Sequence, residues 1–241
     1  MEKHLVIVIL LCSTVAFAED TIKKCPYEDH KCIEEMATII MDKFSNGEES
    51  IHLENFNPLE VKQLRINTDA TNPVYLDLRV TEAVLTGLKG MKISKAKGFG
   101  KDLKGPHSLT STGKAVSLVG KYTANGKVLL LPVRGDGPSN FTFLDPIYTV
   151  KFKGEPVEKN GKTYLKVKDF DLKINISRMI TRVDNLFNDP ILSKEMNKFF
   201  NENWSEIYGE LRQAINRAMS DHFERVYRGV FDNVPYDELF K

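Results

Sequence analysis

The sequence predicts an α+β fold in which a strongly curved antiparallel β-sheet wraps one long C-terminal α-helix. Apolar and polar residues alternate with period two between positions 51 and 170, which indicates strands with one buried and one wet face. After position 188 the apolar residues recur about every 3.6 positions, as in an amphipathic helix. The inner face of the strands is the only large apolar surface that can bury this helix. We therefore expect the sheet to roll around the helix and to enclose an internal hydrophobic tunnel.

The first 18 residues have the layout of a secretory signal peptide. Lys3 gives a short positive region, Leu5–Leu11 an apolar core, and Ala16-Phe17-Ala18 a small-x-small cleavage site. The alternative is a membrane anchor, but the apolar run is shorter than the roughly 20 residues that span a bilayer. We predict cleavage after Ala18, a secreted extracellular protein, and one domain over residues 19–241.

Two cysteines remain once Cys12 is removed with the signal. Cys25 and Cys32 form an even pair, and we expect a disulfide between them in an oxidising compartment. A metal site is the alternative, but it needs three or four ligands and only His30 stands nearby. The sequence therefore predicts neither a metal site nor a cofactor.

An amphipathic helix is predicted over residues 29–46, with Gly47 as its stop signal. Its apolar positions are Ile33, Met36, Ala37, Ile40 and Phe44. The strands follow. Their alternation is clearest in two sets of apolar residues, which are Val74, Leu76, Leu78 and Val80, and then Leu172, Ile174 and Ile176.

Two hairpins are predicted from Asn-Gly pairs, which supply the positive φ that a type I′ turn needs at both central residues. The first is Asn125-Gly126, between 116–122 and 128–133. The second is Asn160-Gly161, between 147–157 and 163–167.

The last quarter predicts one helix of around 40 residues, about 60 Å long at 1.5 Å per residue. It begins at Asn188-Asp189-Pro190, where a capping side chain precedes an acid and an early proline. No further proline intervenes until Pro235. The 3.6-residue period favours a buried helix over a coiled coil, which needs a strict heptad.

Composition narrows the function classes. The 241 residues carry 34 basic and 33 acidic side chains and are 41% hydrophobic. A balanced charge without a concentrated basic footprint argues against nucleic acid. No second apolar run approaches 18 residues, so stable membrane insertion is not expected.

Several short motifs resemble, in their order and spacing, the takeout / juvenile hormone binding protein family of insects, and its takeout branch best. They are Cys25 with Cys32, Phe56-Asn57-Pro58-Leu59, Leu85-Thr86-Gly87-Leu88, the run from Tyr122 to Gly137, Asn185-Leu186-Phe187-Asn188, Asn201-Glu202-Asn203-Trp204, and the run from Val234 to Phe240. The resemblance covers nearly the whole mature chain.

The resemblance implies a tubular lipid-binding super-roll, which agrees with the fold predicted above. It also implies secretion and a carrier role for an apolar ligand, such as a juvenile-hormone-like terpenoid, a fatty acid or another lipid. Roles in feeding, circadian or chemosensory physiology come with the family.

Candidate ligand-lining residues follow from the predicted tunnel, because a lipid pocket is mostly apolar. On the C-terminal helix they are Phe199, Trp204, Ile207, Tyr208, Leu211 and Ile215; on the strands they are Leu130, Phe141 and Phe143. For most of the helix stripe, ordinary core packing is the competing interpretation.

No catalytic motif is present in the sequence: it has neither a G-x-S-x-G elbow nor an H-E-x-x-H pair. Gly98-Phe99-Gly100 and Gly135-Asp136-Gly137 are best explained as turns. The histidines of the predicted mature chain, His30, His52, His107 and His222, are scattered. We expect a non-enzymatic protein, and a lipid-ester hydrolase is the least favoured alternative because no nucleophile has an adjacent base.

A basic run of Lys92, Lys95, Lys97, Lys101 and Lys104 has two interpretations. One is attraction to an anionic membrane or a receptor. The other, which we favour at this stage, is a solvated face of a near-neutral protein.

Three Asn-x-Ser/Thr triplets begin at Asn140, Asn175 and Asn203. We expect glycans at Asn140 and Asn175, because the third triplet borders the apolar stripe of the long helix. We expect a monomer. The main alternative function is a secreted signalling or interaction protein that binds a receptor through its surface, with lipid only filling its core.

Overall fold

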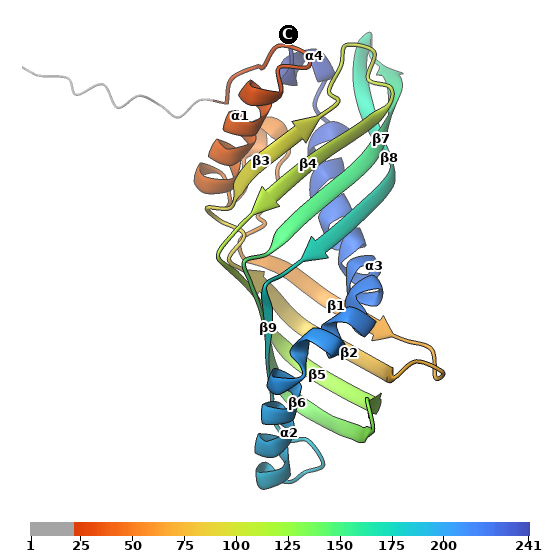
Figure 1. Cartoon of the computed structure of the whole chain (residues 1–241). Helices are drawn as coiled ribbons and strands as arrows, with labels where there is room; N and C mark the ends of the chain where they lie inside the picture. The colour runs from red at the N-terminus through yellow and green to blue at the C-terminus, as the bar shows by residue number, and fades with distance from the viewer. Residues whose placement is uncertain (1–21) are drawn as a thin grey trace, which may run out of the picture.

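The structure is a computed structural model that describes residues 22–241. The predicted signal peptide, its cleavage site and Cys12 lie outside the described residues. Two antiparallel sheets follow one another along the long helix α3, one at each end of an elongated molecule (Figure 1).

The first sheet has five strands in the order β1-β2-β5-β6-β9. Their bounds are β1 Leu59–Asn67, β2 Val74–Thr86, β5 Ala115–Val128, β6 Leu131–Leu144 and β9 Arg178–Val183. The second sheet has four strands in the order β3-β4-β7-β8. Their bounds are β3 Lys92–Lys97, β4 Pro106–Thr112, β7 Ile147–Lys159 and β8 Lys162–Asn175.

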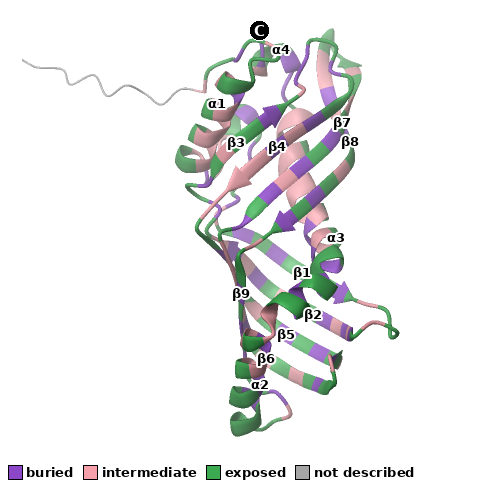
Figure 2. Cartoon of the chain, viewed as in Figure 1, coloured by how far each residue is buried: buried purple, intermediate pink, exposed green. Residues whose placement is uncertain are grey.

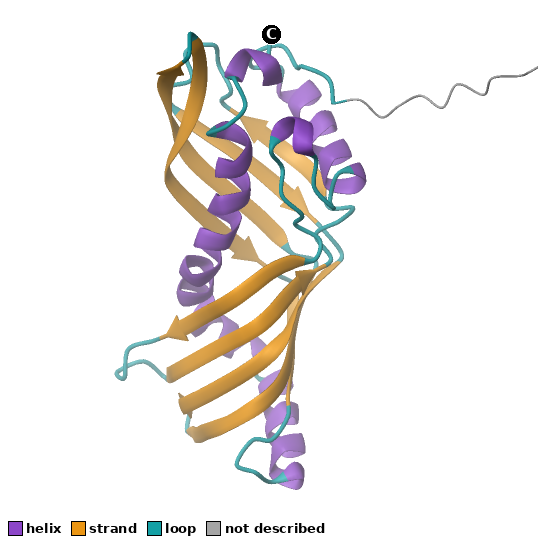
Figure 3. Cartoon of the chain, turned by 180° about the vertical axis from the view of Figure 1, so that it is seen from behind, coloured by secondary structure: helices purple, strands orange, loops and turns teal. Residues whose placement is uncertain are grey.

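The helices are α1 His30–Lys43, the 3₁₀ turn η1 Glu49–Ile51, α2 Pro190–Glu202, α3 Trp204–Phe231 and the short α4 Tyr236–Leu239. Figure 3 shows α3 crossing the concave sides of both sheets, while α2 continues beside the five-stranded sheet. The predicted α+β class, with its long C-terminal helix and curved antiparallel strands, is confirmed. The single sheet that we expected is in fact two.

The predicted 40-residue helix is divided at Asn203, whose backbone (φ −103°, ψ 19°) leaves the helical region. The predicted start of the helix is confirmed, but the capping residue is Asp189 rather than Asn188. The Asp189 side chain accepts from the N–H groups of Ile191 and Leu192, and Pro190 occupies the first turn. The Asn203 side-chain Nδ2 donates to the carbonyl of Phe199 at 2.9 Å, so this side chain satisfies a group left free by the break.

The break allows α2 to follow the edge of the five-stranded sheet. Asn197 donates to the Val183 carbonyl (2.7 Å) and accepts from its N–H (2.9 Å). Asn201, one turn on, does the same to Thr181, with both bonds at 2.8 Å. Each amide imitates a neighbouring strand, so the free edge of β9 is closed.

The four-stranded sheet is closed by helices in the same manner. On β8, Tyr208 donates to the Ile174 carbonyl (2.8 Å) and Asn216 accepts from its N–H (3.2 Å). On β3, Glu34 of α1 accepts from the N–H of Ala96 (2.8 Å), and Thr38 accepts from that of Ile93 (3.0 Å). These bonds fix α1 and α3 on opposite edges of one sheet.

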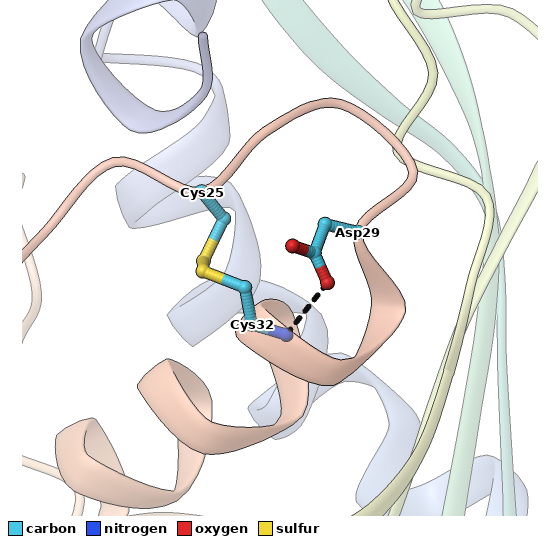
Figure 4. The surroundings of a disulfide bond; sticks show 3 residues. All are labelled: Cys25, Asp29 and Cys32. Atoms are coloured by element: carbon cyan, nitrogen blue, oxygen red, sulfur yellow. Dashed lines mark hydrogen bonds between the residues drawn. A yellow bond between two sulfur atoms is a disulfide. The ribbon is translucent and has the colours of Figure 1, made fainter.

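The predicted N-terminal helix is confirmed as α1, which is shorter than 29–46. Asp29 caps it by accepting from the N–H of Cys32 at 3.0 Å (Figure 4). The predicted disulfide is also present, with a Cys25–Cys32 sulfur distance of 2.03 Å.

One of the two predicted hairpin turns is correct. Asn160 (φ 53°) and Gly161 (φ 74°) form the tight turn between β7 and β8. The Asn125-Gly126 turn is wrong, because β5 continues to Val128 and turns at positions 129–130. Gly126 lies mid-strand, where a Cβ would stand 2.2 Å from the Tyr75 carbonyl oxygen. The glycine therefore permits close approach of β2 rather than a turn.

Candidate functional site: two apolar cavities along one helix

Two apolar cavities lie along α3, one inside each sheet. The smaller cavity, of about 90 Å³, lies inside the five-stranded sheet, and the larger, of about 210 Å³, inside the four-stranded sheet. The N-terminal half of α3 lines the smaller cavity through Ile207, Leu211, Ile215 and Met219. Its C-terminal half lines the larger one through Phe223, Val226, Tyr227, Val230 and Phe231. One amphipathic helix therefore supplies a wall to both cavities.

Strand residues complete the smaller cavity. Every strand of the five-stranded sheet contributes inward side chains, among them Leu64, Leu78, Leu118, Val133 and Val183. These positions alternate with exposed ones, as the banded strands of Figure 2 show. The period-two pattern therefore aims one face of each strand at the cavity.

The larger cavity has a different wall. Only β3, β4 and β7 contribute from its sheet, through Ile93, Leu109, Ser111, Tyr148 and Val150. The remaining residues come from α1, η1, α3, Leu59 at the start of β1, the loops before β1, before β3 and after β3, and both ends of the described chain.

Tyr148 lines both cavities and is 3% exposed. Its ring stacks on Phe223 with 5.3 Å between the centroids. Burial raises the pKa of the Tyr148 hydroxyl, so the side chain stays neutral where the two cavities meet.

The lining is almost free of charge. Among the residues that line the two cavities, Lys23 at the rim of the larger one is the single charged side chain. Residues 22–241 contain no cluster of three or more His, Cys, Asp or Glu that could hold a metal ion. Walls of this kind bind apolar groups and offer little to an ionic ligand.

The structure places five of the nine predicted lining residues in a cavity. Phe141, Phe143, Ile207, Leu211 and Ile215 all line the smaller one. These five residues lie on the inward phase of their helix or strand, which is also the phase that faces the cavity.

The other four predictions are corrected. Leu130 is 90% exposed, because it forms the tip of the β5–β6 turn. Phe199 and Trp204 are half-buried beside the helix break and line neither cavity. Tyr208 is buried, but its hydroxyl is bonded to the edge of β8, and its ring is not part of either wall.

The residues of the larger cavity were missed, although signals for them existed. The α1 stripe of Ile33, Met36, Ala37 and Ile40 faces this cavity. So do Leu239 and Phe240 of the C-terminal segment. Their amphipathic pattern was visible in the sequence, but it could not show that three distant segments close one space.

Both ends of the described range, residues 22–241, meet at the larger cavity. Cys25 accepts from the N–H of Lys241 (2.9 Å), and the Lys241 carbonyl accepts from the N–H of Tyr27 (3.0 Å). Phe240 packs on Tyr236 with 4.7 Å between ring centroids. The disulfide from Cys25 to Cys32 then ties this pair of ends to α1.

A buried histidine supports the wall of the larger cavity. His107 is fully buried, and its Nδ1 accepts from the N–H of Phe99 at 2.9 Å. Its Nε2 donates to the Leu103 carbonyl at 3.1 Å. Burial lowers the pKa of His107, against the opposing influences of that carbonyl and of Asp102. The neutral imidazole therefore holds Phe99, which lines the cavity.

Asn57 holds the loop that precedes β3. Its side-chain oxygen accepts from the N–H groups of Gly87, Leu88 and Lys89 at 3.0–3.2 Å. Leu88 lines the larger cavity. The Phe56-Asn57-Pro58-Leu59 and Leu85-Thr86-Gly87-Leu88 motifs are thus brought together by one side chain.

The turn predicted at Gly135-Asp136-Gly137 is wrong, because these residues lie within β6 and pair with β5. Gly98-Phe99-Gly100 follows the end of β3. Both fragments have steric explanations. A Cβ at Gly98 would lie 2.6 Å from the Pro106 carbonyl oxygen, and one at Gly135 would lie 2.7 Å from the Tyr122 hydroxyl. That hydroxyl donates to the Asp184 carbonyl at 2.7 Å, and burial raises its pKa to about 12. Among the triplet asparagines, Asn175 is exposed at the end of β8, while Asn140 and Asn203 are half-buried.

A family model described as haemolymph juvenile hormone binding protein matches residues 5–241. The chain belongs to this family. The takeout-like resemblance seen in the sequence motifs is confirmed, since the family model spans nearly all of the chain and takeout-like relatives are found. The family description names a haemolymph protein that binds a hormone, so the family is one of ligand-binding proteins.

Within the family, the chain is 28% identical over 229 residues to the circadian clock-controlled protein daywake of Drosophila melanogaster, covering 91% of this chain and 87% of daywake. It is 26% identical over 226 residues to daywake of Drosophila yakuba, with the same coverage. The crystal structure of Takeout 1 from Epiphyas postvittana aligns with a TM-score of 0.79 at 22% identity, over 91% of this chain and all of Takeout 1. This last likeness shows that the two share a fold.

Proposed function

We propose that this member of the family is a secreted carrier that binds an elongated hydrophobic ligand in its interior. The ligand class is a juvenile-hormone-like terpenoid, a fatty acid or another lipid. Binding rather than bond-making is the mechanism: the protein shields the ligand from water and releases it elsewhere. The two cavities, joined at Tyr148, are proposed as one binding tunnel.

The observation that carries this proposal is the larger cavity. An apolar cavity of about 150 Å³ stays dry and binds benzene in a well-studied protein, and this one measures about 210 Å³. The smaller cavity continues along the same helix. Burial of each CH₂ group contributes about 0.8 kcal/mol, so a chain of ten or so carbons reaches micromolar affinity or better after the costs of binding.

The family match and the predicted signal peptide support the secretion that we propose. In an oxidising compartment the Cys25–Cys32 bond is stable, and the exposed Asn175 becomes a glycan acceptor, with Asn140 as the second. Because the named relatives are circadian clock-controlled, a role in circadian, feeding or chemosensory physiology is part of the proposal.

The test begins with the full chain expressed in secreting insect cells. The purified protein is extracted with organic solvent, and the extract is analysed by mass spectrometry. We expect one stoichiometric long-chain or isoprenoid species. A clean extract, from protein that also takes up no fluorescent long-chain fatty acid, would contradict the carrier and favour a surface-acting interaction protein.

A further inference from the structure

The outer face of the four-stranded sheet carries a dense array of lysines. Its members come from three strands and are exposed or half-exposed: Lys92, Lys95 and Lys97 on β3, Lys151 and Lys153 on β7, and Lys166, Lys168 and Lys173 on β8. We call this set the lysine face. It includes only the first three members of the basic run seen in the sequence, since Lys101 and Lys104 follow in the loop after β3.

Strand register arranges the lysine face in rows. One row runs Lys95, Thr110, Thr149, Lys173 across the four strands. The next runs Lys97, Ser108, Lys151, Asp171. The side chains of these rows point away from the core, because the residues between them, such as Leu109, Val150 and Leu172, are buried.

The charge of this face is poorly compensated. Asp169 pairs with Lys153 at 2.8 Å and Glu155 with Lys168 at 3.5 Å, and Asp171 lies opposite Lys151 in the register. Three acidic residues therefore face eight lysines, in a chain whose formal net charge is only +1. In the described structure Lys92, Lys95 and Lys173 make no ion pair within 4.0 Å.

The residue types on the lysine face favour one kind of partner over others. Besides the lysines and the three acidic residues it carries serine and threonine hydroxyls, and Tyr164 of β8 lies at its end. It has no arginine, because no arginine occurs between Arg79 and Arg134 or between Arg134 and Arg178. Arginine and aromatic side chains are the usual anchors of protein interfaces, and arginine forks are the usual readers of single phosphate groups. An array of lysine point charges instead suits a diffuse anionic surface.

We propose that the lysine face is a docking surface for an anionic lipid bilayer. Neither helix α2 nor α3 covers it, since the strands β4 and β7 lie in front of α3 in Figure 1. The inner face of the same sheet lines the larger cavity. Adsorption on this face brings that cavity to within one sheet layer, about 10 Å, of the bilayer. The docking itself does not depend on any cargo.

The test is cosedimentation of the purified chain with phosphatidylcholine vesicles, with and without about 30 mol% phosphatidylserine. The variant K95Q/K97Q/K151Q/K173Q removes four charges from the lysine face. The matched control K127Q/R134Q/R178Q/R182Q removes four exposed charges from the five-stranded sheet. All eight side chains are on the surface, so both variants should fold, which thermal melting checks.

We expect the chain to bind the anionic vesicles and not the neutral ones. Each lysine near such a surface changes the partition coefficient about fivefold, so the lysine-face variant should lose several hundredfold and the control far less. Binding should vanish in about 1 M NaCl, where the Debye length is about 3 Å. Equal losses in both variants, equal binding to neutral vesicles, or binding to a sulfated polysaccharide but not to vesicles would each overturn the proposal. If the protein binds anionic vesicles but its organic-solvent extract contains no lipid, the docking proposal stands while the carrier proposal fails.

Discussion

The two halves of the molecule enclose apolar space by different means. The five-stranded half builds its cavity mainly from the inward phase of every strand together with α2 and α3, and Tyr148 and Ile174 of the other sheet complete it. The four-stranded half needs α1, η1, α3, three loops and both ends of the described chain in addition to its strands. The regular half leaves about 90 Å³ and the composite half about 210 Å³. Regular strands interdigitate closely with a helix, whereas segments joined from distant parts of the chain leave more space.

The two halves also differ in what holds the cavity wall in place. In the five-stranded half, hydrogen bonds from α2 to β9 fix the wall along a continuous strand edge. In the four-stranded half, the wall depends on a disulfide, a buried histidine and a terminal segment. We therefore expect ligand exchange to occur in the composite half, because loops and terminal segments of low local stability open at lower cost than a whole sheet.

The largest expected effect comes from truncating one aromatic residue in each half. Phe240 lines the larger cavity and Phe200 the smaller, and each is 7% exposed. Phe240→Ala and Phe200→Ala should each lower the free energy of unfolding by about 3–5 kcal/mol. Denaturant titration measures this loss.

Only Phe240→Ala should also speed the release of a bound fluorescent fatty acid, because it opens the terminal segment over the larger cavity. Equal release rates from both variants would remove the distinction between the halves.

The disulfide should have the next largest effect. Replacing Cys25 and Cys32 together by serine releases the joined chain ends from α1. On the chain-entropy model the free energy of unfolding falls by about 2–3 kcal/mol. An unchanged thermal melting curve would show that the terminal segment is held by packing alone.

Acid should weaken the composite half. Burial lowers the pKa of His107 in the folded state, so the unfolded chain binds protons more readily. The stability contributed by neutral His107 is therefore complete above pH about 6.5 and is lost as the pH falls from there toward the folded pKa. Protonation at Nδ1 also breaks the bond from the Phe99 N–H. Fatty-acid release should accelerate over this range of pH.

His222 provides the control for this prediction. Burial lowers its pKa as well, but it lies on neither cavity wall. His107→Gln should abolish the pH dependence of release, while His222→Gln should preserve it. If His222→Gln also lost the pH dependence of release, a group other than His107 would be responsible for it.

The smallest effect is expected at Leu130. Because its side chain is 90% exposed at a turn, Leu130→Ser should change stability by less than about 0.5 kcal/mol and leave fatty-acid binding intact. A clear loss of binding, measured by fluorescence titration, would restore Leu130 to the site.

The sequence predicted regular elements well and composite ones poorly. Period-two alternation placed Leu76 and Leu78 on the inner face of β2, and helical spacing placed Ile207, Leu211 and Ile215 on a cavity wall. The sequence pattern could not show the helix break at Asn203. The break lets α2 follow the edge of β9, where Asn197 and Asn201 bond to strand residues that lie 14 and 20 positions away. Nor could the pattern show that Asn125-Gly126 lies within a strand, since that depends on the approach of β2.

The larger cavity was beyond sequence reasoning for the same physical cause. Met36, Leu88, Tyr227 and Phe240 line one space, although they lie far apart in the chain. A periodic pattern tells which face of each segment is buried, but not which segments share the space or how completely they fill it.

The most direct test of the account fills each cavity with the same side chain. Ala37 of α1 lines the larger cavity and Ala124 of β5 the smaller, so Ala37→Phe and Ala124→Phe form a matched pair. Titration with a fluorescent long-chain fatty acid, alongside a thermal melt, compares them. We expect Ala37→Phe to weaken binding at least tenfold and Ala124→Phe to weaken it less. Undiminished binding by a folded Ala37→Phe protein would contradict the claim that the larger cavity holds the ligand.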